Sequence, residues 1–216
     1  LRRLLVETGA TRFEYQWPDE YRLDEQLRAF CAELTLPTAA VDTHHFVTGR
    51  QEVADFFAGK KTYLLESFYR HLRRREGLLM QGGNEPAGGR WNFDAENRKK
   101  LPHQLTPPPP LRFEHDLTAI DGMIEAQGLP HFGEADASTL PWPLNREEGL
   151  KLLDHFIEHL LPNFGRYQDA LTHRHNSLYH SRLSFALNTK MLSPAEVVQR
   201  VAATWEERPT HAGLAQ

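Results

Sequence analysis

The chain has 216 residues, of which 40% are hydrophobic, and its 25 basic and 29 acidic side chains give a net charge of −4. These values are typical of a globular chain, and because no run of about 18 apolar residues occurs, a membrane-spanning helix is excluded. The single cysteine, Cys31, excludes an internal disulfide framework and a self-contained four-cysteine zinc or iron–sulfur site. No secretory signal pattern is present, so we expect a cytoplasmic protein without a membrane partner.

Helix and strand signals alternate in the first part of the chain. We predict a helix over residues 19–34 and a strand over residues 38–47, which together indicate an α/β layer. The apolar residues at helical spacing are Leu23, Leu27, Phe30, Cys31 and Leu34.

Capping boxes predict two more helices. Thr48 with Gln51 begins a short one, and Thr62 begins a longer one that ends at Gly77. The apolar stripe of the longer helix comprises Leu64, Leu65, Phe68, Tyr69 and Leu72. Its opposite face carries Arg70, Arg73, Arg74 and Arg75.

Regular periodicity is absent from residues 81–114, where glycines and prolines interrupt the chain. A loop of this length is uncommon inside a compact domain. We therefore predict an interdomain linker here, between an α/β domain in residues 1–80 and an all-α domain in residues 115–216.

The pattern beyond the linker is helical. We predict a helix over residues 116–127, and a second that begins at a capping box of Asn145 with Glu148 and ends at residues 162–163. Ser193 begins a third helix, whose apolar stripe comprises Val197, Val198, Val201 and Trp205.

Histidines invite a metal interpretation. His155 and His159 have the spacing of a two-histidine ligand pair, but no third ligand is evident nearby. We expect both to be edge residues of a packed helix, and we predict neither a metal site nor a pair of acid–base catalysts.

Charge is unevenly distributed along the chain. Residues 1–59 carry 6 basic and 10 acidic side chains, residues 60–100 carry 10 and 5, and residues 101–216 carry 9 and 14. The basic middle could meet a phosphate backbone, or it could be a solvated helix face.

Two segments could carry chemistry. Residues 88–102 combine glycines, two aromatics and a run of hydrogen-bond donors at residues 97–100, which suits phosphate contact or a packed interdomain strap. In the second segment, Ser181 and Ser184 are three residues apart and could present two hydroxyls on one helical turn as a pyrophosphate cradle. Asn176 and Ser177 nearby could equally cap a core helix.

These segments carry a family resemblance. The run from Tyr63 to Pro102, especially residues 77–80 and 88–98, resembles the deoxyribodipyrimidine photolyase-related family of bacterial iron–sulfur cryptochromes and (6-4) photolyases. The second segment resembles the photolyase pattern in which a tyrosine precedes a Thr/Asn-Ser-x-Leu-Ser turn that holds the phosphates of FAD. The resemblance covers residues 6–205.

The resemblance implies a fold. Residues 1–80 would be the C-terminal part of a Rossmann-like α/β antenna domain, and residues 115–216 the first helices of a helical FAD-binding domain. Since the chain begins with Leu1, we expect a piece of a longer protein. The four cluster cysteines and the catalytic histidine would then follow Gln216, and the piece alone would be inactive.

The resemblance also implies site residues. The expected FAD ligands are Tyr167, His180, Ser181, Arg182, Leu183 and Ser184. His180 departs from the Thr or Asn of the general pattern. The expected DNA contacts are Asn97, Arg98, Lys99 and Lys100; no catalytic residue is assigned.

The implied function is light-driven repair of UV-induced pyrimidine photoproducts in DNA by an FAD-dependent photolyase of the (6-4) type, acting as a monomer. The alternatives are a blue-light flavin photoreceptor of the same family without repair activity, and a scaffold without flavin. An iron–sulfur cluster and a lumazine-type antenna chromophore are further cofactors that the resemblance suggests.

Overall fold

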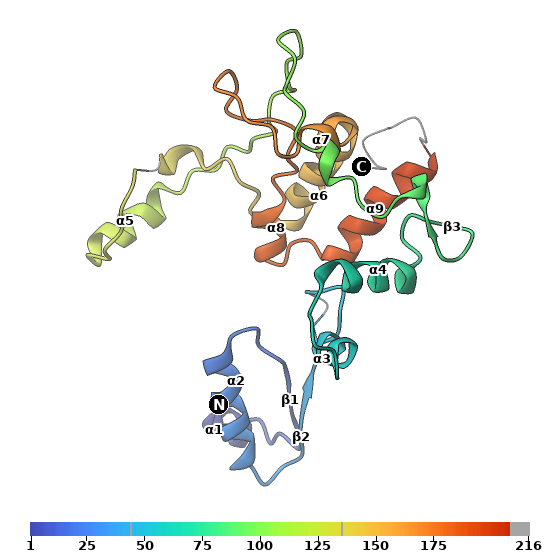
Figure 1. The fold of residues 1–216 in the computed structure, drawn as a ribbon. Helices are drawn as coiled ribbons and strands as arrows, with labels where there is room; N and C mark the ends of the chain where they lie inside the picture. Colours follow the sequence, from blue (N-terminus) through green and yellow to red (C-terminus); the bar gives the residue numbers. More distant parts are fainter. Residues whose placement is uncertain (44, 135, 208–216) are drawn as a thin grey trace. The chain divides into compact units, whose positions relative to one another are not determined.

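A computed structural model of the chain describes residues 1–43, 45–134 and 136–207, the last three by their backbone alone (Figure 1). The described part is predominantly helical with two small sheets. It forms two compact units, Leu1–Tyr63 and the residues from Leu64 onward. None of its helices has both the length and the apolar character that crossing a bilayer requires.

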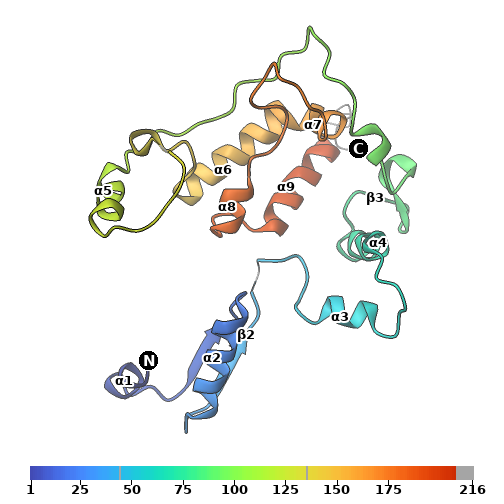
Figure 2. The same cartoon turned by 60° about the vertical axis from the view of Figure 1, so that its left-hand side comes forward.

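The first unit contains a parallel β-α-β arrangement (Figure 2). Strands β1 and β2 pair with Phe13 opposite Thr38, and the ring of Phe13 lies 5.6 Å from that of Phe30 on the connecting helix. This confirms the predicted helix, strand and α/β layer; the Rossmann-like antenna domain stays a prediction. The elements are α1 (Arg2–Glu7), β1 (Phe13–Gln16), α2 (Tyr21–Ala32), β2 (Thr38–Val41) and α3 (Glu52–Phe57).

Strand β2 is shorter than the predicted span of residues 38–47. The carboxylate of Asp42 accepts hydrogen bonds from the backbone N–H groups of Thr43 at 2.7 Å and Arg50 at 3.1 Å. These bonds turn the chain immediately after the strand, because a short carboxylate competes with the ladder for backbone donors.

Both capping boxes predicted in this part of the sequence are wrong. Gln51 has a helical backbone, and its side-chain amide donates to Asp55 instead. Helix α4 (Leu65–Glu76) begins three residues later than Thr62 predicted, after an uncapped Leu64. Leu64 and Leu65 are 56% and 78% exposed, so they are not part of a buried stripe.

Helix α4 ends as predicted at Gly77, whose φ of 65° is the left-handed conformation that glycine adopts freely. One of its four arginines departs from the prediction of a polar face. Arg73 is buried, and its guanidinium donates to the carbonyls of Leu78 and Leu79 and to the hydroxyl of Tyr69.

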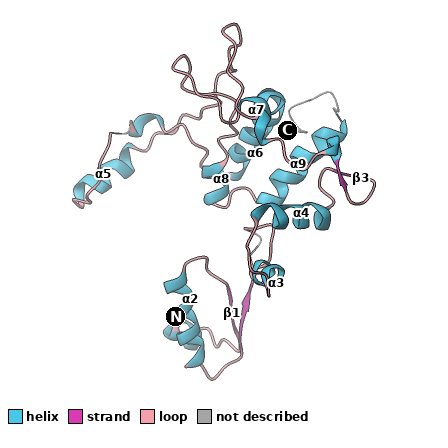
Figure 3. Ribbon diagram, in the orientation of Figure 1, coloured by secondary structure: helices cyan, strands magenta, loops and turns pink. Residues whose placement is uncertain are grey.

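Residues 81–114 consist mainly of loops, as Figure 3 shows. They contain one short hairpin, β3 (Met80–Gln81) with β4 (Glu85–Pro86), and two 3-10 turns, η1 (Ala87–Gly89) and η2 (Asp94–Glu96). The assignment of residues 1–80, 81–114 and 115–216 to domains and a linker stays a prediction.

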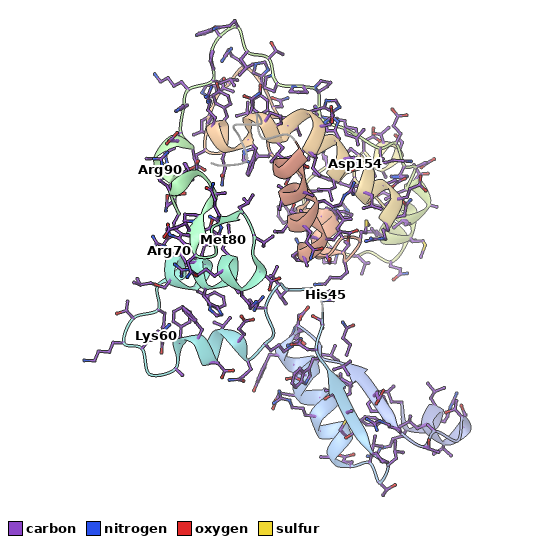
Figure 4. The ribbon with its side chains drawn as sticks, turned by 90° about the vertical axis from the view of Figure 1, so that its right-hand side faces the viewer. His45, Lys60, Arg70, Met80, Arg90 and Asp154 are labelled. Atoms are coloured by element: carbon purple, nitrogen blue, oxygen red, sulfur yellow. The ribbon has the colours of Figure 1, made fainter. Side chains whose placement is uncertain are left out.

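Trp91 fastens this segment to α4. Its indole ring has three guanidinium carbons within cation–π distance, from Arg70 at 5.3 Å, Arg73 at 5.2 Å and Arg74 at 4.6 Å. Figure 4 shows Arg70 on α4 and Arg90 on the segment that follows. Trp91 therefore anchors the segment after α4 to that helix.

Helices joined by loops make up the rest of the second unit. The prediction that a helix ends at Pro162 is wrong. Pro162 lies in the first turn of α7, where a residue needs no N–H for the helical hydrogen bonds. A π-helical turn joins α6 to α7. The elements are α5 (Thr118–Ala126), η3 (Ala137–Thr139), α6 (Arg146–His155), η4 (Phe156–Leu160), α7 (Leu161–Tyr167), α8 (Ser184–Asn188) and α9 (Pro194–Glu207).

Two predicted caps in this unit are confirmed. The side chain of Asn145 accepts from the N–H of Glu148 at 2.9 Å, and Ser193 accepts from that of Glu196 at 3.1 Å. Val197 and Val201 pack against the core, whereas Val198 is 37% exposed. The side chain of Trp205 lies outside the described residues.

The core of this unit is formed mainly by the face that α6, η4 and α7 share, with α8 packed on it (Figure 1). Leu153 and Ala186 are fully buried at its centre. Because Tyr167, Tyr179 and Leu183 belong to the same core, it fixes both ends of the loop that joins α7 to α8.

Candidate nucleotide-binding groove

A groove of about 810 Å³ lies between two loops of the second unit. One wall is the run of prolines at residues 107–110, and the other is the loop at residues 170–182, named here the groove loop. Prolines have no backbone N–H, so the proline wall offers carbonyl groups and ring surfaces only. The volume falls in the range of small-molecule sites. Its polar and aromatic lining residues are Arg112, Trp142, Thr172, Arg174, His175, Asn176, Ser177, His180 and Arg182.

The groove is cationic. Three arginines and two histidines line it, and none of its described lining residues carries a carboxylate. Burial, followed by the nearby charge of Arg112, lowers the pKa of Arg182, but a guanidinium stays protonated at any physiological pH. Such a surface attracts anions.

Arg182 is held rigidly at the end of the groove loop. Its backbone is left-handed, with a φ of 57°, which costs a residue other than glycine about 1–2 kcal/mol. Its guanidinium donates to the carbonyl of Leu111 at 2.8 Å and lies 4.8 Å from the ring centre of Trp142. Both contacts orient the positive charge without neutralising it.

Arg174 ties the groove loop to the segment before the proline wall. It donates to the carbonyls of Leu101 at 2.9 Å, His103 at 3.1 Å and Pro102 at 3.3 Å. Carbonyl groups hold this arginine too, and no described carboxylate pairs with it.

His155, at the end of α6, supports the proline wall. Its ring hydrogen-bonds the backbone of Pro109, and its buried Nε2 atom has no partner among the described residues. Since proline offers only a carbonyl, Nδ1 must donate, which leaves an unprotonated Nε2 facing the interior. Burial and the ring of His159, 4.9 Å away, lower the pKa of His155.

His155 is half-buried and its neighbour His159 is exposed, at the join of α6 and η4. No group of three or more His, Cys, Asp or Glu side chains that could hold a metal occurs within residues 1–43, 45–134 and 136–204. Cys31 is a free, half-buried thiol on α2.

The structure places the six predicted FAD residues in different surroundings. His180 and Arg182 line the groove. Tyr167 and Leu183 are buried in the core, where Tyr167 stacks on Tyr179 at 5.6 Å. Their assignment to FAD stays a prediction.

The two serines do not share a helical turn, contrary to expectation. Ser184 is the first residue of α8 and is exposed, whereas Ser181 precedes the helix, and its hydroxyl accepts from the N–H of Leu183 at 3.5 Å. The left-handed backbone of Arg182 lies between them and breaks the helical path.

The four predicted DNA contacts separate into one buried and three exposed residues. Asn97 is 8% exposed, and its backbone carbonyl accepts from the N–H of Asp169 at 3.1 Å. The acceptors around its side-chain amide assign the nitrogen to the side of Gly165, whose carbonyl it reaches at 3.0 Å. Asn97 therefore fastens its segment to α7 and does not face solvent. The exposed residues are Arg98, Lys99 and Lys100.

Carboxylates already pair with two of these three cations. Arg98 lies 3.4 Å from Asp169, and Lys99 lies 3.9 Å from Glu96. Lys100 has no ion pair within the described part of the chain.

Sequence reasoning missed the proline wall, Arg112, Trp142 and Arg174. The prolines indicated only a linker, and the arginines stand singly in segments with no motif. A cation two residues after a run of four prolines, as at residues 107–112, is the signal that could indicate this wall.

Comparison with known proteins gives a family and two relatives. A family model described as "Deoxyribodipyrimidine photo-lyase-related protein" matches residues 1–140. A (6-4) photolyase of Agrobacterium fabrum is 30% identical over 209 residues, which cover 96% of this chain and 41% of that protein. An uncharacterized protein of Acanthamoeba polyphaga mimivirus is 25% identical over 92 residues, or 41% of this chain and 46% of that one.

The match covers almost the whole of this chain, but only about two fifths of the length of the (6-4) photolyase. The family model covers well over half of the chain, including α4 and the segment anchored by Trp91. The chain belongs to the deoxyribodipyrimidine photolyase-related family.

Proposed function

We propose that this chain is part of an FAD-dependent photolyase that uses blue light to reverse UV-induced pyrimidine photoproducts in DNA, of the (6-4) type. Family membership and the similarity to a (6-4) photolyase support the reaction class. The observation that carries the proposal is that two of the predicted FAD residues, His180 and Arg182, line a cationic groove.

The groove's donors fit the diphosphate of a dinucleotide. Guanidinium groups match phosphate oxygens in pairs, and the neighbouring Asn176 and Ser177 add neutral donors. When bound, reduced flavin would supply the electron that light drives into the pyrimidine pair. In this proposal His180 and Arg182 hold the phosphates, and the hydroxyls of Ser181 and Ser184 contribute from the start of α8.

The proposal assigns DNA contact to the exposed cations Arg98, Lys99 and Lys100, which would bind phosphates irrespective of sequence. We further propose a cytoplasmic monomer. No ligand for an iron–sulfur cluster or an antenna chromophore is proposed among the described residues.

The test is a repair assay with the purified complete protein of which this chain is part. The protein is given DNA that carries either a (6-4) photoproduct or a cyclobutane dimer, and lesion loss is measured under blue light and in the dark. Light-dependent loss of the (6-4) photoproduct supports the proposal. Bound flavin without repair supports a photoreceptor, and a colourless protein that gains no flavin supports a scaffold; either result overturns it.

A further inference from the structure

Residues 116–134 and 136–139, named here the arm, leave the second unit and return to it at one place. His115 and Leu140 form an antiparallel bridge in which the N–H of each donates to the carbonyl of the other, at 3.3 Å and 2.9 Å. The ring of His115 also hydrogen-bonds Glu148 on α6 at 3.0 Å. The arm is therefore fastened at its base, and its helix α5 stands apart from α8 and α9 in both Figure 1 and Figure 2.

Helix α5 is largely apolar, yet it buries none of its residues. Ile120, Met123 and Ile124 lie on one face at helical spacing, and the first two are 51% and 60% exposed. Leu129 and Phe132, which follow the helix, are exposed as well. A nine-residue helix with a glycine in its middle is marginal in water without packing. An exposed apolar face on such a helix is typical of a docking surface.

The charge of the arm restricts what can cover this face. No lysine or arginine occurs between Arg112 and Arg146. Two of the arm's carboxylates, Asp116 and Asp136, accept from the neutral hydroxyl and N–H groups of nearby threonine and serine residues, which leave the charge uncancelled. The carboxylates of the arm are those of Asp116, Asp121, Glu125, Glu134 and Asp136.

Like charges repel, so neither a phosphate backbone nor the arm of a second copy suits this surface. The partner that fits is a polypeptide with an apolar cleft and a rim of lysines and arginines, into which one face of a helix can be laid.

We propose that the apolar face of α5 docks into a basic-rimmed cleft formed by the part of the complete protein that lies outside residues 1–216. The match to the (6-4) photolyase covers only 41% of that protein. A cleft on the same polypeptide is also present at a high effective concentration, which favours it over a separate molecule. The docked arm would fasten the second unit to the rest of the protein. The inference does not depend on the proposed reaction.

The first experiment asks whether the face is covered. The complete protein with the substitution Glu125→Met carries one methionine on the apolar face, Met123, and a new one on the opposite face of the same helix. Dilute hydrogen peroxide is added, and sulfoxide formation at each methionine is followed by mass spectrometry. Met123 should oxidise several-fold more slowly than the new methionine. Equal rates, or faster oxidation of Met123, would overturn the inference.

The second experiment identifies the occupant. Phe132 is fully exposed, so its replacement by the photoreactive p-benzoylphenylalanine leaves the packing of the described residues unchanged. After irradiation of the complete protein, the cross-linked peptide should come from outside residues 1–216 and contain lysine or arginine. A mixture of isotope-labelled and unlabelled protein reveals cross-links between copies. Cross-linking to a second copy, to residues 1–216 or to nothing would each overturn the inference, whatever the repair assay gives.

Discussion

Two regions of the second unit hold their cations in different ways. In the turn at residues 94–100, Arg98 and Lys99 lie within ion-pair distance of carboxylates. In the groove, Arg174 and Arg182 donate to backbone carbonyls, and no described lining residue is acidic. A carbonyl fixes a guanidinium without cancelling its charge, so the groove keeps the positive potential that the turn largely loses.

This difference shows that charge summed along the sequence is a poor guide to where cations without carboxylate partners lie. Residues 101–216 are net acidic, yet they contain the groove. Several of their acidic side chains, on α6 and α9, have basic partners elsewhere. The pairs are Glu147 with Lys151, Glu148 with His115, Asp154 with Arg200 and Glu196 with Arg146.

The largest expected effect is a loss of folding stability at the buried residue Asn97. Asn97→Ala should lower the free energy of unfolding by about 1–3 kcal/mol, because the buried carbonyl of Gly165 loses its donor. Lys100→Ala, at an exposed position, should change it by no more than about 0.5 kcal/mol. Urea denaturation measures both, and equal losses would contradict a structural role for Asn97.

A second stability effect concerns the rigid end of the groove. Arg182→Ala should cost about 1–2 kcal/mol, since it removes the bond to Leu111 and the contact with Trp142. Arg182→Gly removes the same contacts but adopts the left-handed backbone freely, so it should be about 1 kcal/mol more stable than the alanine variant. Identical unfolding curves for the two variants would show that the backbone at this position is not strained.

The half-buried ring of His155, which supports the proline wall, predicts that the stability of the protein depends on pH. The pKa of His155 is lowered in the folded protein, chiefly by burial, so the unfolded chain binds this proton more readily. The stability that the neutral ring contributes is fully present above about pH 6.5, the ordinary histidine value, and declines as the pH falls below it. Unfolding free energies of the wild type and His155→Gln, measured from neutral to mildly acidic pH, should converge at the acidic end. Parallel curves would rule out this contribution.

The smallest effect is expected in the turn itself. Replacing Arg98 and Lys99 together by alanine should reduce the salt dependence of DNA binding by less than two lost phosphate contacts would, because their carboxylate partners already offset part of the charge. A full two-contact loss would place the main DNA-binding surface in the turn, and an unchanged slope would remove the turn from DNA binding.

Local signals allowed much of the fold to be predicted. The caps at Asn145 and Ser193 and the left-handed stop at Gly77 depend on neighbouring residues only, and all three are confirmed. The predicted starts of α3 and α4 are wrong, because a threonine near a helix start, with or without a glutamine three residues later, also occurs in other turns. Pro162 was misread because a proline that ends one helix and a proline that begins the next look the same in sequence.

The groove could be predicted only in part. His180 and Arg182 stand in a recognisable motif, but Arg112 and Arg174 reach the same groove from segments about sixty residues apart, which no local pattern relates. The burial of Asn97 likewise depends on a distant carbonyl, at Gly165.

The most direct test compares the two regions in one assay. The flavin content is measured side by side for Arg182→Gln and for the Arg98→Ala, Lys99→Ala double variant of the complete protein of which this chain is part. Our account predicts loss of flavin in the Arg182 variant alone, because Arg182 lines the groove and is held by a carbonyl and not by a carboxylate. Equal flavin content in the two variants would contradict it.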